Sequence, residues 1–429
     1  MAVELMGGES VKIDEREEQA LLDGITTRFV RYAKVCTTSD KTVEATPSTP
    51  GQWELAKMLV GELNAIGLTD VELTDHCYVL ASLPSNIDSA LQVPVIGFLA
   101  HLDTAGEVSG KDVGPQIITN YNGGKIILND NIVLDPEVET GLAAQKGGTI
   151  IHTDGTTLLG ADDKAGIAEI VSAAAFLIRH PEIKHGGIEI IFSPDEETGK
   201  GLPCFPLEKI KSTACWTLDG GPLGELEIEC FNACSADISF YGKVIHPGSA
   251  RGILVNAALM AAVYAAMLPR NESPEATDGY YGYYCVMNIA GNEEKASLEL
   301  IVRDFTQDGM RRRITALDAF AKAVEAQFPG GKVCVNAKES YRNMKEKIEE
   351  HPRVLAKLKE AAALCGVDFK LKPIRGGTDG SRLTELGIPT PNIWTGGRNF
   401  HSKGEWVSAG EMLAACKLII ELAAVWAKK

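Results

Sequence analysis

The chain has 429 residues, of which 45% are hydrophobic and 23% charged, as expected for a globular protein of two or three domains. Its 58 acidic residues outnumber its 42 Lys and Arg residues, giving a formal net charge of −16. Such a charge argues against nucleic acid or an anionic membrane surface as a partner. The arginine run at 311–313 is accordingly expected to be a solvated helix face. Ten cysteines occur without a CxxC pair, which excludes thiolate zinc fingers and redox dithiols.

The first nineteen residues, MAVELMGGESVKIDEREEQ, carry charges throughout and lack the apolar core of a signal peptide. The longest apolar stretches elsewhere are too short to span a membrane. Cysteines that occur singly are typical of proteins from a reducing compartment. Together these features predict a cytoplasmic protein that binds no membrane.

The first part of the chain alternates helical and strand patterns. Apolar residues at helical spacing predict helices at 19–32, 52–66 and 165–179. Continuous apolar runs predict strands at 93–100, 188–193 and 214–218. The Gly- and Asn-rich stretch 106–131 predicts loop with short strands. Alternating strands and helices indicate an α/β domain with a largely parallel or mixed sheet.

The pattern changes near residue 229 and returns to its earlier form after about residue 345. Between these points the predicted order is strand, helix (255–267), strand, strand (296–303), helix (310–327) and strand (332–336). This order is ferredoxin-like. The final part predicts a helix at 353–365, a strand at 392–395 and a helix at 409–428. We therefore predict an α/β domain in two pieces, 1–228 and 345–429, with an α+β domain inserted at 229–344.

Acidic or imidazole-bearing turns follow several of the predicted strands. They are HLDT at 101–104, GADDKAG at 160–166, PDEETG at 194–199, DGG at 219–221 and RNFH at 398–401. Ligands of open α/β sheets bind beyond the carboxyl ends of the strands, so we expect these turns to converge on one crevice. Taken singly, each turn has an ordinary structural explanation, such as a helix N-cap for Asp162-Asp163. Their common position after strands of one domain is what favours a metal site.

The residue types in these turns suit a pair of metal ions. Imidazoles and carboxylates without a thiolate favour zinc, manganese or cobalt. Two such ions share a bridging carboxylate, hold a hydroxide nucleophile and polarise a carbonyl or phosphoryl oxygen. The adjacent Glu196 and Glu197 can supply one metal ligand and one general base. His101 and Asp103 point to the same side of an extended chain, so Asp103 can orient a ligating imidazole.

In this order, HLDT, GADDKAG, PDEETG, LDGG and the late histidine after TGGRN resemble the M20 metallopeptidase family. The resemblance extends to HPGSARG and VNA in the inserted domain, to IVRDF, and to PIRGGTDGSRLTELGIPTPN. It covers nearly the whole chain and leaves about the first twenty residues as an N-terminal extension. The resemblance implies a mixed-sheet zinc-peptidase catalytic domain with an inserted ferredoxin-like domain that serves as a lid and for dimerisation.

The resemblance also assigns roles to the turn residues. It implies two Zn²⁺ ions, with Co²⁺ or Mn²⁺ as alternatives. The expected ligands are His101, Asp162, Glu197, Asp219 and His401. Asp162 is expected to bridge both metals, and a cis peptide is expected between Asp162 and Asp163. Asp103 is expected to orient His101, and Glu196 to act as the general base.

Four residues are expected to contact the substrate. His246, in a His-Pro-Gly turn, is expected to help hold the tetrahedral oxyanion when the lid closes. Asn256 and Arg303 are expected lid contacts, although a salt bridge from Arg303 to Asp304 or another acid is an alternative. Arg375 is expected to pair with the C-terminal carboxylate of the substrate. The resemblance further implies a homodimer formed through the inserted domain.

The resemblance implies a metal-dependent aminopeptidase that removes the N-terminal residue from tripeptides, with small peptides as its partners. Within the same fold, a carboxypeptidase or an N-acyl-amino-acid deacylase is an alternative. A peptide- or metal-binding protein without turnover is an alternative of another class. A phosphoesterase is a further alternative, because dinuclear sites also serve phosphoryl transfer.

Overall fold

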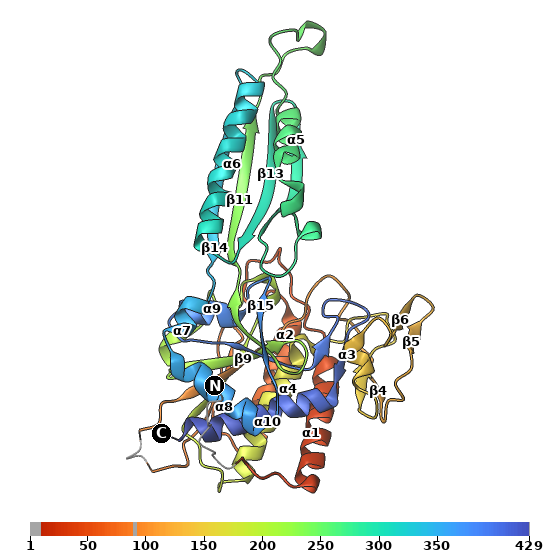
Figure 1. The fold of residues 1–429 in the computed structure, drawn as a ribbon, viewed down its shortest axis with the longest axis vertical. Coiled ribbons are helices and arrows are strands. Elements are labelled where there is room, and N and C mark those ends of the chain that lie inside the picture. The colour runs from red at the N-terminus through yellow and green to blue at the C-terminus, as the bar shows by residue number, and fades with distance from the viewer. Residues whose placement is uncertain (1–9, 89–91, 429) are drawn as a thin grey trace, which may run out of the picture. The chain divides into compact units, whose positions relative to one another are not determined.

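The structure is a computed structural model, and it describes residues 10–88 and 92–428. The chain forms two compact units (Figure 1). The first consists of the chain up to Ile228, Glu346–Lys372 and Thr378 onward. The second consists of Glu229–Lys345 and Pro373–Gly377. The short segment 373–377 therefore groups with the inserted unit. The proposed N-terminal extension lies partly outside the described residues, and its last residues belong to the first helix.

An eight-stranded sheet forms the centre of the first unit, in the order β1-β2-β8-β3-β9-β16-β10-β15. Its strands are β1 (Asp70–Leu73), β2 (Val79–Leu83), β3 (Ile96–His101), β8 (Ile188–Ser193), β9 (Ala214–Gly220), β10 (Glu225–Cys230), β15 (Lys370–Ile374) and β16 (Asn392–Trp394). Strands β8, β3, β9 and β16 are parallel, whereas β1, β2 and β10 run antiparallel to their partners. The predicted mixed sheet is therefore confirmed. Because neighbouring parallel strands end at the same edge, their carboxyl-terminal turns lie together.

Helices cover both faces of this sheet. They are α1 (Glu15–Ala33), α2 (Pro50–Ala65), α4 (Ala161–Arg179), α7 (Lys345–Glu349), α8 (Pro352–Leu364), α9 (Asp379–Glu385) and α10 (Ala409–Trp426). Helix α4 packs on β3 and β9 and is covered in turn by α1 and α10, so nearly all of its side chains are buried. On the opposite face, Leu383 of α9 packs against Leu99 and Ile191 of the sheet. Along the described parts of the chain, no helix has both the length and the apolar character needed to cross a membrane.

A smaller sheet in the first unit carries the last of the predicted turns. Its order is β17-β18-β7-β4, and a separate hairpin pairs β5 with β6. The elements are β4 (Gln116–Ile118), β5 (Ile126–Asn129), β6 (Ile132–Leu134), α3 (Thr140–Ala143), β7 (Ile150–His152), β17 (Gly397–Arg398) and β18 (Trp406–Ser408). The buried Trp406 packs into a small core of its own with these elements. The turn between β17 and β18 contains His401, so this sheet fixes where that histidine lies.

The second unit is a four-stranded antiparallel sheet with two helices (Figure 1). Its elements in chain order are β11 (Asn232–Tyr241), α5 (Ala257–Met267), β12 (Tyr283–Gly291), β13 (Lys295–Asp304), α6 (Gln307–Gln327) and β14 (Lys332–Tyr341). This is the ferredoxin-like order predicted from the sequence. Helices α5 and α6 pack on the sheet and enclose an apolar core with it.

The arginine run at 311–313 differs in part from the expected solvated face. Arg311 and Arg312 are exposed, but Arg313 is buried. Arg313 forms ion pairs with Asp304 and, at 2.9 Å, with Glu272. A buried guanidinium requires such paired carboxylates because desolvation of an unpaired charge is costly. Helical spacing places Arg313 on the side of α6 that faces the sheet. The prediction overlooked this spacing because it treated the three arginines as one charged patch.

Candidate active site

Side chains from five separate turns meet at the carboxyl edge of the large sheet. His101 ends β3, Asp162 lies in the first turn of α4, Glu197 lies in the short helix η2 (Glu196–Thr198) after β8, Asp219 is the penultimate residue of β9, and His401 lies between β17 and β18. The structure thus brings together all five residues expected to bind metal. They come from parts of the chain separated by as many as 300 residues.

Asp162 lies between the two imidazoles. Its Oδ1 atom is 2.9 Å from Nε2 of His101, and its Oδ2 atom is 3.1 Å from Nε2 of His401. Oδ1 of Asp219 is 3.7 Å from Nε2 of His101, and Oε1 of Glu197 is 2.9 Å from Nε2 of His401. Each histidine therefore shares Asp162 and has one further carboxylate of its own. A pair of metal ions that shares one bridging carboxylate requires such an arrangement.

The backbone that presents Asp162 is unusual and firmly held. A cis peptide joins Asp162 to Asp163, as the family resemblance implied. The buried carboxylate of Glu405 accepts the backbone N–H groups of residues 159, 160, 161 and 162 at 2.7, 2.8, 2.7 and 3.2 Å. These hydrogen bonds fix the turn that leads into α4. Sequence reasoning missed Glu405, because only its position four residues after His401 connects it with the site.

Asp103 connects His101 to the turn that carries the two glutamates. Nδ1 of His101 is 3.0 Å from the backbone oxygen of Asp103 and 3.3 Å from its Oδ1 atom. The same carboxylate accepts the backbone N–H of Glu196 at 2.9 Å and that of Glu197 at 3.1 Å. Asp103 is fully buried. A single carboxylate thus positions an imidazole and both glutamates.

Asp195, which precedes the two glutamates, anchors their turn from the other side. Its backbone has a left-handed conformation with φ 56°. Its carboxylate accepts the backbone N–H of Ser48 at 2.7 Å and the side-chain amide of Gln52 at 2.7 Å. Its own N–H donates to Oε1 of Gln52 at 3.0 Å. The turn is therefore tied to helix α2, on which Gln52 lies.

Burial and crowding of like charges perturb the acids of the site. Desolvation, followed by repulsion from Asp219, raises the pKa of Glu196 well above its usual value. Desolvation raises the pKa of Glu197 to about 7 and that of Asp219 to about 6, and the charge of Asp162 adds to both shifts. Desolvation also acts on Asp162, but hydrogen bonds with both imidazoles outweigh it and lower its pKa. Contacts with Asp162 and Glu197 raise the pKa of His401 to about 11.

This set of donors fits divalent cations. Ligand atoms of His101, Asp162 and Glu197 lie within 4.8 Å of one another, and so do those of His101, Asp163 and Asp219. Asp163 was not an expected ligand, and its Oδ2 atom already accepts the N–H of His101 at 3.1 Å. Imidazole nitrogens and carboxylate oxygens are the ligands of catalytic zinc sites. Cations here would counteract the burial and the repulsion that raise the pKa values of these acids.

The four residues expected to contact substrate all belong to the second unit. His246 is exposed, and its Nδ1 atom accepts the N–H of Gly248 at 3.1 Å. Asn256 caps helix α5, its side chain accepting the N–H of Leu259 at 3.0 Å. Both side chains therefore have local structural partners in addition to any role toward a ligand.

The two arginines are held by their surroundings. Arg303 donates to the backbone oxygen of Val302 at 3.0 Å, and its guanidinium lies 5.5 Å from the ring centre of Tyr341. The alternative salt bridge to Asp304 is not formed, because Asp304 pairs with Arg313. Arg375 donates to backbone oxygens of the 277–281 loop, including that of Gly279 at 2.8 Å. Its guanidinium therefore organises this loop.

Comparisons with known proteins identify the family of the chain. A sequence model described as peptidase family M20/M25/M40 matches residues 152–424. The chain is 48% identical over 407 residues to peptidase T of Geobacillus sp. (strain WCH70), across 94% of this chain and 99% of that protein.

The fold is also similar to that of solved structures. The aminopeptidase PepT from Bacillus cereus ATCC 10987 matches with a TM-score of 0.74 and 23% identity, across 95% of this chain and 99% of that one. A dinuclear metal-binding peptidase of the M20 family from Bacillus subtilis matches with a TM-score of 0.65 and 15% identity, across 95% and 98%. At these identities the likeness demonstrates a common fold.

Proposed function

The chain belongs to the peptidase family M20/M25/M40, and from this premise we propose that it is a metal-dependent aminopeptidase that removes the N-terminal residue from tripeptides. The observation that carries the proposal is the placement of Asp162 between His101 and His401, with a further carboxylate beside each histidine. The relationship to peptidase T over nearly the whole chain supports a small peptide as the substrate.

In this proposal the site holds two Zn²⁺ ions, with Co²⁺ or Mn²⁺ as alternatives. His101, Asp162 and Asp219 hold one ion, and His401, Asp162 and Glu197 hold the other. When bound, the two ions polarise the scissile carbonyl and lower the pKa of a water molecule near it. The mixture of imidazole and carboxylate donors supports zinc over magnesium or calcium, which prefer oxygen ligands alone.

Glu196 is the general base of the proposed reaction. Its carboxyl group takes a proton from the attacking water and delivers it to the leaving amine. Burial raises the pKa of Glu196, and a carboxylate with a raised pKa accepts a proton more readily. Asp103 supports this role by holding the backbone of Glu196 in place and by orienting His101.

The second unit supplies further substrate contacts in the proposal. Because Nδ1 of His246 accepts a backbone N–H, a neutral imidazole there carries its proton on Nε2, which suits a donor to an oxyanion. Asn256 and Arg303 are proposed to contact the peptide. Arg375 is proposed to pair with the C-terminal carboxylate, for which it must give up some of its bonds to the 277–281 loop.

Two properties of the whole protein belong to the same proposal. The inserted unit is proposed to form a homodimer, and its edge strand β12 supports this by exposing Val286, Met287 and Ile289. An exposed apolar edge strand is suited to pairing with another chain. A cytoplasmic location is proposed because all ten cysteines are free.

The test is mass-spectrometric product analysis with trialanine, N-acetyl-trialanine and dialanine, each with zinc and again with a chelator. Release of alanine and dialanine from free trialanine alone, abolished by the chelator, is the expected result. Cleavage of the acetylated peptide would instead indicate a carboxypeptidase or a deacylase. If no peptide is cleaved, isothermal titration that detects trialanine binding would indicate a binding protein. In a separate assay, phosphate release from a generic phosphate ester would indicate a phosphoesterase.

A further inference from the structure

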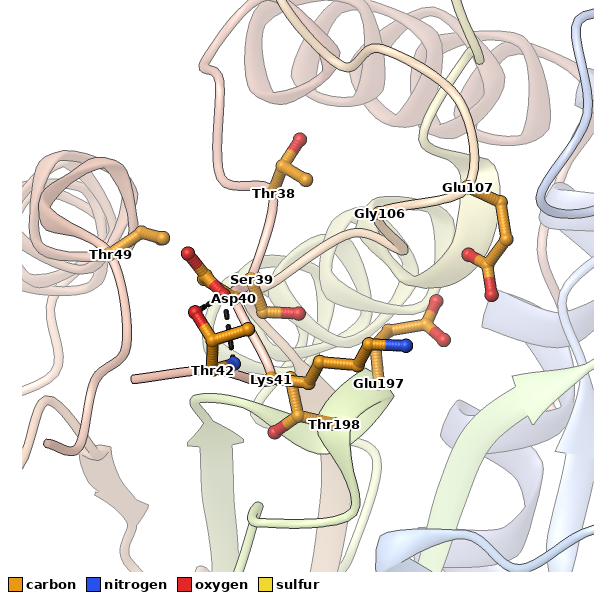
Figure 2. A pocket seen from close by; sticks show the side chains of 10 residues that line it. All are labelled: Thr38, Ser39, Asp40, Lys41, Thr42, Thr49, Gly106, Glu107, Glu197 and Thr198. Carbon is orange, nitrogen blue, oxygen red and sulfur yellow. Dashed lines mark hydrogen bonds between the residues drawn. The ribbon is translucent and has the colours of Figure 1, made fainter. Parts of the chain in front are cut away.

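A cavity of about 520 Å³ lies in the first unit beside the proposed metal centre (Figure 2). Segment 38–42 and Thr49 line one part of it, and the Gly106-Glu107 loop and the Glu197-Thr198 turn line the rest. Glu197 belongs both to this cavity and to the group of proposed metal ligands. The cavity therefore adjoins the proposed metal centre at Glu197.

The wall of the cavity is tied to the turns that carry the metal site. The backbone N–H of Ser39 donates to the oxygen of Thr104 at 3.1 Å, one residue after Asp103. The buried ammonium of Lys164, in the turn that contains Asp162, donates at 2.7 Å to the oxygen of Val35, which precedes the lining segment 38–42 in the chain. These contacts preform the cavity in a fixed relation to the metal ligands, as is usual for small-molecule sites.

The charges of the cavity favour a cation. If Glu197 is a metal ligand, the remaining charged groups are Asp40, Glu107 and Lys41, which together carry one net negative charge. Figure 2 shows Lys41 extending toward the side on which Glu107 and Glu197 lie. Oδ1 of Asp40 accepts both the N–H and the hydroxyl of Thr42, at 2.8 and 2.6 Å. Oδ1 of Asp40 is therefore engaged within its own turn.

Glu107 is the carboxylate of the cavity that is placed to receive a ligand. Its side chain is 66% exposed, and its one ion-pair contact among the described residues is a distance of 3.7 Å from Oε2 to Nδ1 of His401. That distance is too long for a direct hydrogen bond. The Glu107 carboxylate thus lies beside His401, a proposed metal ligand. It forms no hydrogen bond with that imidazole, so its oxygens can still accept hydrogen bonds from a ligand.

We propose that this cavity is the subsite for the N-terminal residue of the peptide and that Glu107 pairs with its α-ammonium group. This inference rests on the proposed aminopeptidase function. An aminopeptidase cleaves the peptide bond that follows the N-terminal residue. The α-ammonium group of that residue is separated from the scissile carbonyl carbon only by the Cα atom, so it must lie close to the metal centre. The cavity opens next to the metal centre and is large enough for one residue with any side chain.

A competing role for Glu107 is to orient His401, since carboxylates often hold metal-ligating imidazoles. The two roles differ in what they affect. A carboxylate that pairs with the ammonium discriminates between substrates with and without that group. A carboxylate that orients His401 affects metal affinity and the turnover of every substrate alike.

The experiment compares Glu107→Gln with Glu137→Gln, a control that removes an exposed carboxylate elsewhere in the first unit. The substrates are trialanine and propionyl-dialanine, which lacks only the amino group. We expect Glu107→Gln to lower kcat/KM for trialanine about tenfold or more, mainly through KM, as loss of a charge-assisted hydrogen bond does. Propionyl-dialanine should be unaffected, as should both substrates in the control.

Binding is measured separately by calorimetry in the zinc-loaded Glu196→Ala variant. This variant is used because its slow turnover should leave the peptide intact during the measurement. The free peptide should bind more tightly than the propionyl peptide, and Glu107→Gln should remove the difference. Equal losses for both peptides together with weaker zinc binding would overturn the proposal in favour of the His401 role. Weaker trialanine binding in Lys41→Met with stronger binding in Glu107→Gln would mean that the cavity receives the carboxylate end. If the wild type does not cleave trialanine, the proposed function fails, and calorimetry alone decides the subsite.

Discussion

The carboxylate of Glu405 accepts the backbone N–H of Asp162, the residue that lies between the two site histidines. It also accepts the N–H groups of the three preceding residues. A carboxylate that receives four backbone donors holds the turn in one conformation, because each N–H would otherwise be buried without an acceptor. Glu405 therefore determines the position of Asp162, the proposed bridging ligand, through backbone hydrogen bonds. None of these bonds involves the side chain of a proposed metal ligand.

We expect Glu405→Gln to weaken zinc binding by about 10- to 100-fold, the usual effect of removing a group that orients ligands. The amide nitrogen of glutamine cannot accept the hydrogen bonds that one carboxylate oxygen now receives. Zinc affinity is measured by competition with a chromogenic chelator.

The matched control for this prediction is Glu189→Gln. Glu189 also accepts backbone N–H groups, from Lys211 and Ser212, but it lies near the start of β8, at the opposite end of the strand from the metal site. Its substitution should lower the free energy of unfolding without changing zinc affinity. An equal loss of zinc affinity in both variants would show that Glu405 acts only through general stability.

The sequence predicts the regular elements well where their hydrophobic pattern is long. The strand at 188–193 is observed at those residues, and the last helix ends two residues before its predicted end. The short strands β1 and β2 were not predicted, because four or five residues carry too little periodicity. The small sheet around β7 was expected only as loop with short strands.

The candidate site is predictable to the extent that its residues stand in strand-end turns. His101 and Glu197 are recognisable in this way, because His101 ends a buried parallel strand and Glu197 follows one. Contacts that join distant turns are not recognisable, since they depend on tertiary packing. Examples are Glu405 with the turn before α4 and Asp103 with the backbone of Glu196. Arg313 was misassigned for a different reason, because its helical spacing from the buried Met310 and Leu317 was overlooked.

We expect Glu196→Ala to keep both metals bound and to reduce kcat on trialanine about 10³-fold or more. The side chain is proposed to transfer protons without being a ligand, so its removal should not change the metal content. Steady-state rates and metal analysis on the same preparation provide the measurement. Turnover near the wild-type level would refute the role of Glu196, and loss of metal would make it a ligand instead.

Asp103→Asn should reduce kcat because the asparagine NH₂ group cannot accept a hydrogen bond. At least one of the backbone N–H groups that now donate to the carboxylate would then lose its acceptor. Those donors include the N–H groups of Glu196 and Glu197. We expect a reduction of about 10- to 100-fold, together with weaker zinc binding, since His101 also loses its carboxylate partner.

A double-mutant cycle of Asp103→Asn with Glu196→Ala tests whether Asp103 acts through Glu196. If it does, the combined loss should be smaller than the sum of the two single losses in free energy, because residues that act as a unit are not additive. Rates are measured at saturating zinc, so that the effect on metal binding does not enter. Full additivity would mean that Asp103 serves His101 alone.

The stability of the metal-free protein should depend on pH through Glu227, which is buried on β10 and accepts a hydrogen bond from Asn392 at 2.6 Å. Burial, followed by the charge of Asp219, raises the pKa of Glu227 from 4.5 to about 8. Between these values the folded state keeps a proton that the unfolded state has lost. The contribution of Glu227 to stability is therefore present below pH 4.5 and is lost as the pH rises toward 8.

The measurement is urea unfolding of the chelator-treated protein across this pH range. The free energy of unfolding of the wild type, taken relative to that of Glu227→Gln, should fall with rising pH by at most about 1.4 kcal/mol per pH unit. Glutamine does not titrate, so the variant isolates the effect of this one group. Glu137→Gln, which removes an exposed carboxylate, should parallel the wild type. A difference between wild type and Glu227→Gln that does not change with pH would mean that Glu227 is ionised in the folded protein throughout the range.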